Sequence, residues 1–181
     1  MRLRDQTLTT LFVGTIALSY LAQLLLPRYE EVLWISGFEY RQGEYWRLIT
    51  VAFVHGNLFH LVFNLYTLHI LGTPVELYFG KTKYILILLI SLVFGSLTSA
   101  IFNNPLIASV GASGIIFGLF GSIALLGARV GVEWRGSMII VLINFALGFV
   151  LGGIDWRAHV GGLLGGVGAS ILLLALEKEI N

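Results

Sequence analysis

A serine within a glycine-rich motif is the first residue of this sequence with the potential for chemistry. Ser113 lies in Gly111-Ala112-Ser113-Gly114, a pattern typical of serine nucleophiles. The stretch 84–128 around it contains no Asp, Glu, Lys, Arg or His, so the motif belongs to an apolar segment. A serine becomes an effective nucleophile when an adjacent base accepts its proton. His159, in Ala158-His159-Val160-Gly161-Gly162, is the only histidine late in the chain and is therefore the candidate base.

A second group of polar residues comes earlier in the chain. His60 and Asn64 are four residues apart, so on a helix they project from the same face. Both side chains can donate hydrogen bonds, as can the backbone N–H of Ser113, and such donors suit an oxyanion hole. The alternative for His60 is a buried structural histidine. We expect His55 and His69 to have structural roles.

Composition places these residues in a membrane. The chain has 181 residues, of which 57% are hydrophobic and 12% are charged, too few charges to coat a water-soluble domain. A helix needs about 20 mostly apolar residues to cross about 30 Å of hydrocarbon. The charge-poor runs predict one all-α membrane domain over 1–181, a bundle of six transmembrane helices at 6–26, 51–71, 84–102, 112–128, 136–153 and 158–176.

Lys and Arg are distributed unevenly between these spans. More of them fall on the side that holds both termini, and by the positive-inside rule that side is cytoplasmic. We therefore expect an integral protein of the cell (inner) membrane with both termini in the cytoplasm. A net charge of +1 does not indicate the basic surface that nucleic-acid binding needs, and the lack of cysteine excludes disulfides and thiolate chemistry.

This topology gathers the polar residues at one level. The second, fourth and sixth spans all enter from the outer face, so His60, Asn64, Ser113 and His159 are expected at similar depth. Polar side chains within a membrane usually face the bundle interior or a water-filled cavity. Their clustering at one level therefore argues for a functional site.

Glycine spacing suggests how the fourth and sixth spans meet. His159, Gly162 and Gly166 share one face of the sixth span, and the fourth span carries further glycines at four-residue and three-residue spacing after Gly114. Small residues so spaced let two helices approach closely. Such a contact would carry His159 toward Ser113. The alternative is that the glycine faces are ordinary membrane packing.

Four segments together closely resemble the rhomboid family of intramembrane serine proteases, in the expected order and over nearly the whole chain. Gly43-Glu44-Tyr45-Trp46-Arg47 resembles the family's Trp-Arg loop element, and the stretch 55–64 resembles its pattern of two histidines followed by asparagine. The serine motif 111–114 resembles the Gly-x-Ser-Gly nucleophile motif. The segment 158–166 resembles the last core span, which bears the base.

The resemblance implies a catalytic dyad of Ser113 and His159, with the oxyanion stabilised by His60, Asn64 and the Ser113 backbone N–H. It also implies that a structural loop is partly submerged in the outer leaflet and that an aromatic wall supports His159. Some family members carry tyrosine at position 117, where this chain has phenylalanine. The residues with implied supporting roles are Gly111, Gly114, Phe117, Gly162, Gly166, Trp46 and Arg47.

The function so predicted is endopeptidase cleavage of transmembrane helices near the outer membrane face. The expected partners are transmembrane protein substrates and the lipid bilayer, with no cofactor, no metal and no nucleic acid. We expect substrate to enter laterally past the fifth span, whose outer half is weakened by Ala146-Leu147-Gly148 and Gly152-Gly153. Asp155 leaves two interpretations open: a third member of a triad, or a solvated turn residue beside Arg157. The family's dyad chemistry favours the second.

Other functions remain as alternatives. A catalytically inactive rhomboid-like binder of transmembrane clients would keep the fold. A small transporter or channel is disfavoured because the spans show no carboxylate for ion coupling and the two halves show no repeat. A metal site built from His55, His60 and His159 would lack an accompanying carboxylate or a His-Glu-x-x-His pattern.

Overall fold

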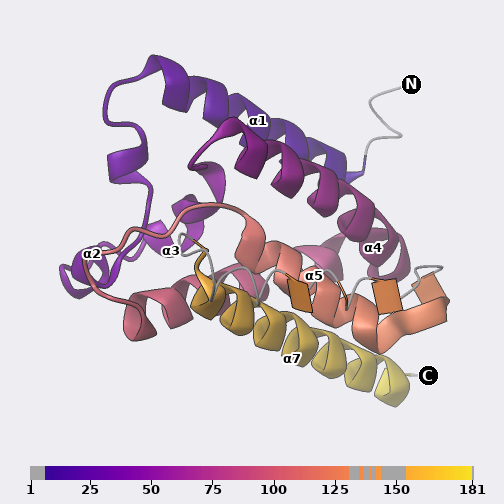
Figure 1. The fold of residues 1–181 in the computed structure, drawn as a ribbon. Coiled ribbons are helices and arrows are strands. Elements are labelled where there is room, and N and C mark those ends of the chain that lie inside the picture. Colours follow the sequence, from indigo (N-terminus) through magenta and orange to yellow (C-terminus); the bar gives the residue numbers. More distant parts are fainter. Residues whose placement is uncertain (1–6, 131–134, 137–138, 140–141, 144–153, 181) are drawn as a thin grey trace.

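The computed structural model describes residues 7–130, 135–136, 139, 142–143 and 154–180. This part is all-helical, as the composition predicts, apart from one isolated antiparallel bridge between Ile35 and Ser109 (Figure 1). Most of the predicted fifth span, 136–153, lies outside the described residues. The glycines of the expected gate, Gly148, Gly152 and Gly153, are among them.

Within the described part, four long helices form the body of the molecule: α1 (Leu8–Leu25), α4 (Leu58–Phe102), α5 (Ser113–Leu126) and α7 (Trp156–Ile180). By length and composition α1, α4 and the Trp156–Glu177 part of α7 could each cross a membrane, whereas α5 is a shorter apolar helix. These helices overlap the spans expected from the sequence. The total of six spans remains a prediction.

Helix α4 reverses its direction at Gly80. This residue has φ 75° and ψ 164°, a non-helical conformation that an L side chain rarely adopts. Gly72 and Tyr84 are twelve residues apart, and in a straight helix they would be separated by about 18 Å. In the structure they are in contact, because a Cβ added to Gly72 would collide with the Tyr84 hydroxyl. The 45-residue α4 is therefore two helices that fold back on each other.

A buried carboxylate ties α1 to the first half of α4. Glu76 is 4% exposed and accepts hydrogen bonds from the backbone N–H groups of Leu8 and Thr9, both at 2.8 Å. The Thr9 hydroxyl also donates to Glu76 at 2.8 Å and lies 2.9 Å from the Tyr84 hydroxyl. This buried carboxylate lies within α4 but beyond the predicted second span, 51–71. The Glu76 carboxylate oxygens hold the start of α1, where the first N–H groups have no acceptor within the helix and favour a negative charge.

Glycines bring α4, α5 and α7 together at one point. A Cβ on Gly162 of α7 would collide with the backbone of Gly114 of α5, and one on Gly166 would collide with the backbone of Gly118. On the α4 side, a Cβ on Gly95 would lie 2.9 Å from the Ala158 carbonyl oxygen and 3.3 Å from Gly114 Cα. α5 and α7 thus make the close contact that the glycine spacing predicts.

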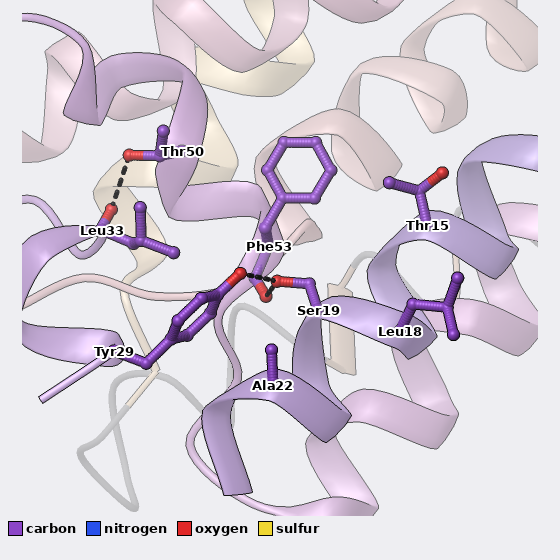
Figure 2. Close-up of a pocket in the computed structure, with 8 residues that line it drawn as sticks. All are labelled: Thr15, Leu18, Ser19, Ala22, Tyr29, Leu33, Thr50 and Phe53. Atoms are coloured by element: carbon purple, nitrogen blue, oxygen red, sulfur yellow. Dashed lines mark hydrogen bonds between the residues drawn. The ribbon is translucent and has the colours of Figure 1, made fainter. Parts of the chain in front are cut away.

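The chain between α1 and α4 forms a compact loop around short helical turns. These are η2 (Glu30–Val32), α2 (Gly37–Arg41), α3 (Arg47–Thr50) and η3 (Val51–Phe53). Ser19 of α1 joins the loop at two points: its hydroxyl donates to the Phe53 carbonyl at 2.8 Å and lies 2.9 Å from the Tyr29 hydroxyl (Figure 2). The predicted second span begins at 51, but α4 begins only at Leu58, where the Asn57 side chain accepts from the His60 N–H at 2.8 Å.

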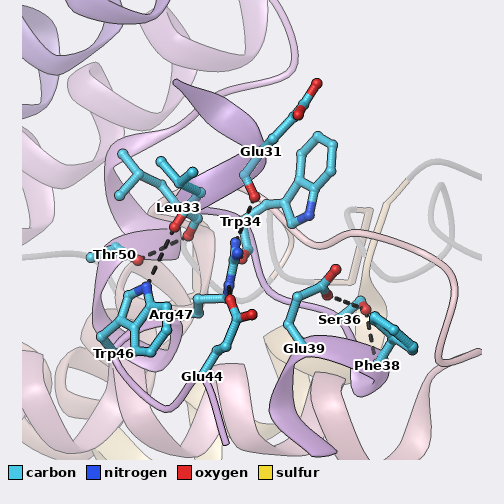
Figure 3. A network of polar contacts seen from close by, with 11 residues as sticks. Glu31, Leu33, Trp34, Ser36, Phe38, Glu39, Glu44, Trp46, Arg47 and Thr50 are labelled. Carbon is cyan, nitrogen blue, oxygen red and sulfur yellow. Dashed lines mark hydrogen bonds and ion pairs between the residues drawn. The ribbon is translucent and has the colours of Figure 1, made fainter. Parts of the chain in front are cut away.

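Arg47 holds the loop together from inside (Figure 3). Its side chain is buried and donates to the Glu44 carboxylate at 2.5 Å and to the carbonyls of Glu31 and Trp34 at 2.7 and 2.8 Å. Trp46 beside it is 55% exposed. Arg47 thus fixes the loop while Trp46 is left to face the surroundings, and a tryptophan so placed suits a membrane interface.

A second polar contact fastens the loop to the segment that precedes the serine motif. The Ser36 hydroxyl bonds Glu39 and also donates to the Pro105 carbonyl at 2.7 Å. Burial raises the pKa of Glu39, but the hydrogen bond from Ser36 and the nearby Arg47 charge outweigh burial, so this pKa lies below its usual range. The loop contacts Pro105 through Ser36 and also through the Phe38 N–H, which donates to the Pro105 carbonyl at 3.0 Å.

Candidate active site

Ser113 and His159 lie within hydrogen-bond distance although they are 46 residues apart in the chain. Ser113 Oγ and His159 Nε2 are separated by 2.9 Å. Ser113 is the first residue of α5, and His159 is buried in the first turns of α7. The glycine contact between the two helices sets this distance, because Gly114 follows the serine directly and Gly162 lies one turn beyond the histidine.

The turn before Ser113 depends on Gly111. This residue has φ +109°, and its N–H donates to the Val51 carbonyl at 2.9 Å. A Cβ at Gly111 would lie 2.7 Å from Cε1 and 2.8 Å from Nε2 of the His60 ring. Both the backbone angle and the neighbouring ring therefore require glycine here. The same contact places His60 directly beside the serine motif.

Phe117 forms one wall around the candidate base. Its ring stacks on the His159 ring, with centroids 4.0 Å apart and an angle of 9° between the planes. Phe117 is 2% exposed and lies one helical turn after Ser113. Phe117 therefore lies where the resemblance implies an aromatic wall, and its supporting role stays a prediction.

His60 and Asn64 share a face of α4, but in the part of the chain that the structure describes their side chains do not donate hydrogen bonds toward Ser113. Asn64 is buried, and its Nδ2 donates to the His60 carbonyl at 2.8 Å. Among the described residues, neither side chain makes a hydrogen bond with Ser113. The amide has a second N–H, so it can still serve an acceptor placed near Ser113.

His55 packs against the His60 ring. The two rings meet edge to face with centroids 5.0 Å apart, and His55 is 1% exposed. The Gln23 side chain of α1 holds the His55 backbone in both directions: it donates to the carbonyl at 2.8 Å and accepts from the N–H at 3.0 Å. Sequence reasoning missed Gln23, because only the approach of α1 to the loop makes it a partner. His69 lies further along α4 on an exposed face.

Asp155 directly precedes α7 and is half-buried. Its Oδ1 accepts from the Ala158 N–H at 3.2 Å, and its Oδ2 accepts from the Ser99 hydroxyl of α4. Its backbone carbonyl accepts from the His159 N–H at 3.3 Å. The carboxylate thus fixes the start of the helix that carries His159. Sequence reasoning missed Ser99.

The surroundings of Asp155 also include Arg157, which turns outward. Its guanidinium lies 4.6 Å from the centroid of the Trp156 ring and donates to the Asn103 side chain at 3.4 Å. Within the described residues, no three His, Asp or Glu side chains are grouped closely enough to hold a metal ion. The donor set that the three-histidine alternative needs is therefore not assembled there.

The amino-acid sequence is similar to those of known proteins. The family model of the rhomboid domain matches residues 42–176. The chain is 38% identical to the rhomboid protease GluP of Bacillus subtilis (strain 168) over 73% of this chain and 27% of GluP. It is 34% identical to the putative rhomboid protease YdcA of the same strain over 85% of this chain and 82% of YdcA. The Rhomboid-like protease 1 of Toxoplasma gondii is 35% identical over 78% of this chain and 50% of that protein. The chain thus spans about a quarter of GluP and most of YdcA.

Proposed function

Since this chain belongs to the rhomboid family, we propose that it is an intramembrane serine endopeptidase that cleaves transmembrane helices near the outer membrane face. The observation that carries the proposal is the 2.9 Å distance between Ser113 Oγ and His159 Nε2. This distance falls within the range of about 2.6–3.2 Å at which a base activates a nucleophile. In the proposed orientation both termini are cytoplasmic and the protein lies in the cell (inner) membrane.

The proposed reaction is acyl transfer through a covalent intermediate. His159 Nε2 takes the proton of the Ser113 hydroxyl as Oγ forms a bond to the substrate carbonyl carbon. The tetrahedral intermediate collapses, the C–N bond breaks, and His159 gives the proton to the leaving amine. Water then attacks the acyl-serine with His159 again as base, which releases the carboxylic acid and restores Ser113.

His60, Asn64 and the Ser113 backbone N–H are the proposed oxyanion donors. The His60 ring already lies against Gly111, within the serine motif, and the first N–H groups of α5 have no helical acceptor. Donors fixed in place before the reaction stabilise the developing charge without a reorganisation cost. Losing one such donor lowers turnover by about 10²–10³ in other serine hydrolases.

Packing, rather than a third catalytic side chain, would orient the base. Phe117 covers one face of the His159 ring, and the glycine contact fixes the backbone beneath it. The two carboxylate oxygens of Asp155 accept hydrogen bonds from the Ser99 hydroxyl and from the Ala158 N–H. These contacts favour a dyad over a triad.

The substrate in this proposal is a transmembrane helix that unwinds near its outer end. Its amides are hydrogen-bonded within the helix, so small or helix-breaking residues near the scissile bond should favour cleavage. Lateral access past the fifth span, 136–153, remains part of the proposal. An inactive relative that binds clients is the alternative, but it would usually lack the serine or the histidine, and here both are present at hydrogen-bond distance.

A fluorophosphonate probe tests the proposal directly, because it reacts only with an activated serine. We expect the purified protein in lipid to be labelled at Ser113 and to cleave a transmembrane substrate. Ser113→Ala should abolish both, and His159→Ala should abolish cleavage, while both variants remain folded and inserted. Labelling of a different serine, or cleavage that persists in Ser113→Ala, would refute the dyad.

A further inference from the structure

Two grooves open between α1 and the loop that follows it, and Tyr29 lines both. The first has a volume of about 420 Å³ and is mainly apolar, with Leu18 and Ala22 on α1 and Leu33 and Phe53 on the loop (Figure 2). The second has a volume of about 490 Å³ and is mainly polar. Ser113 and His159 line neither groove, so both are separate from the candidate active site.

The grooves follow one another along α1. The apolar groove uses α1 residues from Thr15 to Ala22, whereas the polar groove uses residues from Tyr20 to Leu25 and continues into the loop. At a rise of 1.5 Å per residue, the centre of the polar groove lies roughly 6 Å closer to the carboxyl end of α1. Since α1 crosses the membrane in the proposed fold, one groove lies deeper in the leaflet than the other.

Exposed aromatic residues indicate where the membrane surface lies. Tyr45 and Trp46 of the loop are 58% and 55% exposed, and such residues gather at the level of the lipid head groups. On α1, Leu11 and Leu18 are exposed and so suited to lipid. The polar groove beside the loop is therefore at head-group depth, and the apolar groove is at the depth of the acyl chains.

The charges of the polar groove fit a head group with two opposite charges. Arg28 lies at the edge of the polar groove. Its Nε donates to the Glu31 carboxylate at 2.6 Å, and its side chain is 79% exposed. Glu30 accepts from Gln23 at 2.9 Å and retains further acceptor capacity. One cation beside two carboxylates matches a phosphate next to an ammonium that donates hydrogen bonds. An anionic head group would meet the two carboxylates, and a quaternary ammonium has no N–H to donate.

We propose that the two grooves bind one molecule of phosphatidylethanolamine from the surrounding leaflet. Its phosphate lies on Arg28, its primary ammonium lies between the carboxylates of Glu30 and Glu31, and an acyl chain passes Tyr29 into the apolar groove. Each groove has the size of an ordinary small-molecule site, about 300–1,000 Å³. The site is independent of the proposed proteolysis, because none of these residues belongs to the dyad or the oxyanion donors.

Native mass spectrometry of the full chain tests this site. The protein is released from nanodiscs that contain equal amounts of phosphatidylethanolamine, phosphatidylcholine and phosphatidylglycerol. We expect phosphatidylethanolamine to be retained about tenfold over each of the others, as two or three charge-assisted hydrogen bonds allow. Equal retention of the three lipids, or preference for the anionic one, would overturn the proposal.

Matched variants separate the two grooves. Glu30→Gln with Glu31→Gln should remove the preference for phosphatidylethanolamine, whereas Glu39→Gln, in the same loop but outside the grooves, should keep it. Ala22→Phe should fill the apolar groove and lower retention of every lipid, while Leu21→Phe on the neighbouring exposed position should not. An unchanged preference in the double variant, with thermal stability intact, would show that another surface binds the lipid.

Discussion

Phe117 lies face to face with His159 at 4.0 Å, and both side chains are almost completely buried. The imidazole of a catalytic dyad needs a fixed plane, because its Nε2 must point at the nucleophile in each cycle. In this protein a phenyl ring from α5, the helix that begins with Ser113, lies parallel to the imidazole and would fix that plane. The stack therefore links the orientation of the base to the position of α5.

Loss of this stack should slow turnover without unfolding the protein. Phe117→Leu keeps most of the volume but removes a ring contact worth about 0.5–1.5 kcal/mol, so we expect kcat to fall by roughly two- to tenfold. Phe117→Tyr keeps the stack and should retain activity. Phe120→Leu, at the next buried aromatic of α5, is the control for general packing loss. Cleavage assays in proteoliposomes measure each effect, and equal losses in both leucine variants would contradict a special role for the stack.

The proposed oxyanion donors should affect turnover more than substrate binding. His60→Ala and Asn64→Ala should each lower kcat by roughly tenfold to a thousandfold and leave KM little changed, since the interaction forms in the transition state. His69→Ala, on the exposed face of the same helix, should leave kcat unchanged. Normal turnover in both donor variants would remove His60 and Asn64 from the proposed site.

Asp155 distinguishes a dyad from a triad. Asp155→Asn keeps one oxygen as the acceptor for the Ala158 N–H and places an amide NH₂ opposite the Ser99 hydroxyl, which can accept from it. Activity should therefore stay within about tenfold, which corresponds to about 1.4 kcal/mol of barrier. Asp155→Ala removes the cap and should lower the free energy of unfolding by about 0.5–2 kcal/mol. Activity and thermal unfolding are measured on the same samples. A thousandfold loss in the stable Asn variant would make Asp155 a catalytic residue.

The glycine contact should tolerate no side chain. Gly162→Ala would push a methyl group into the Gly114 backbone, so we expect it to lower the free energy of unfolding by about 1–3 kcal/mol and to reduce activity by separating Ser113 from His159. Gly168→Ala is the matched control on α7, because nothing lies within 4 Å of its added Cβ. That variant should be neutral or slightly more stable. Similar stability and activity in the two variants would argue against a tight contact at Gly162.

The sequence was most informative where chemistry and helix periodicity coincide. The pairing of Ser113 with His159 follows from a nucleophile motif, a lone histidine and glycines at four-residue spacing. The bond between Ser99 and Asp155 could not be predicted, because it depends on how α4 and α7 are aligned along their axes. Gln23 was missed for a similar reason: its contact with His55 is made to backbone groups, which leave no pattern in a sequence.

Charge counting also had a physical limit. It separates two apolar runs near Gly80, where α4 reverses its direction. It could not predict that Glu76, which ends one of these runs, is buried; a carboxylate that accepts from the first N–H groups of a helix can be buried at little penalty. It also extended the second span into 51–57, where a 3₁₀ turn and the Asn57 cap precede α4.

The segment around the serine motif is bound to partners that are distant in the chain. Gly111 is bound by Val51, Ser109 by Ile35, and Ser113 by His159 of the last described helix. During synthesis Ser113 therefore emerges well before His159, and the two meet only after α7 has been made and packed. The proposed dyad would thus be assembled only once α7 lies against α5, so a partly made chain would lack the proposed activity.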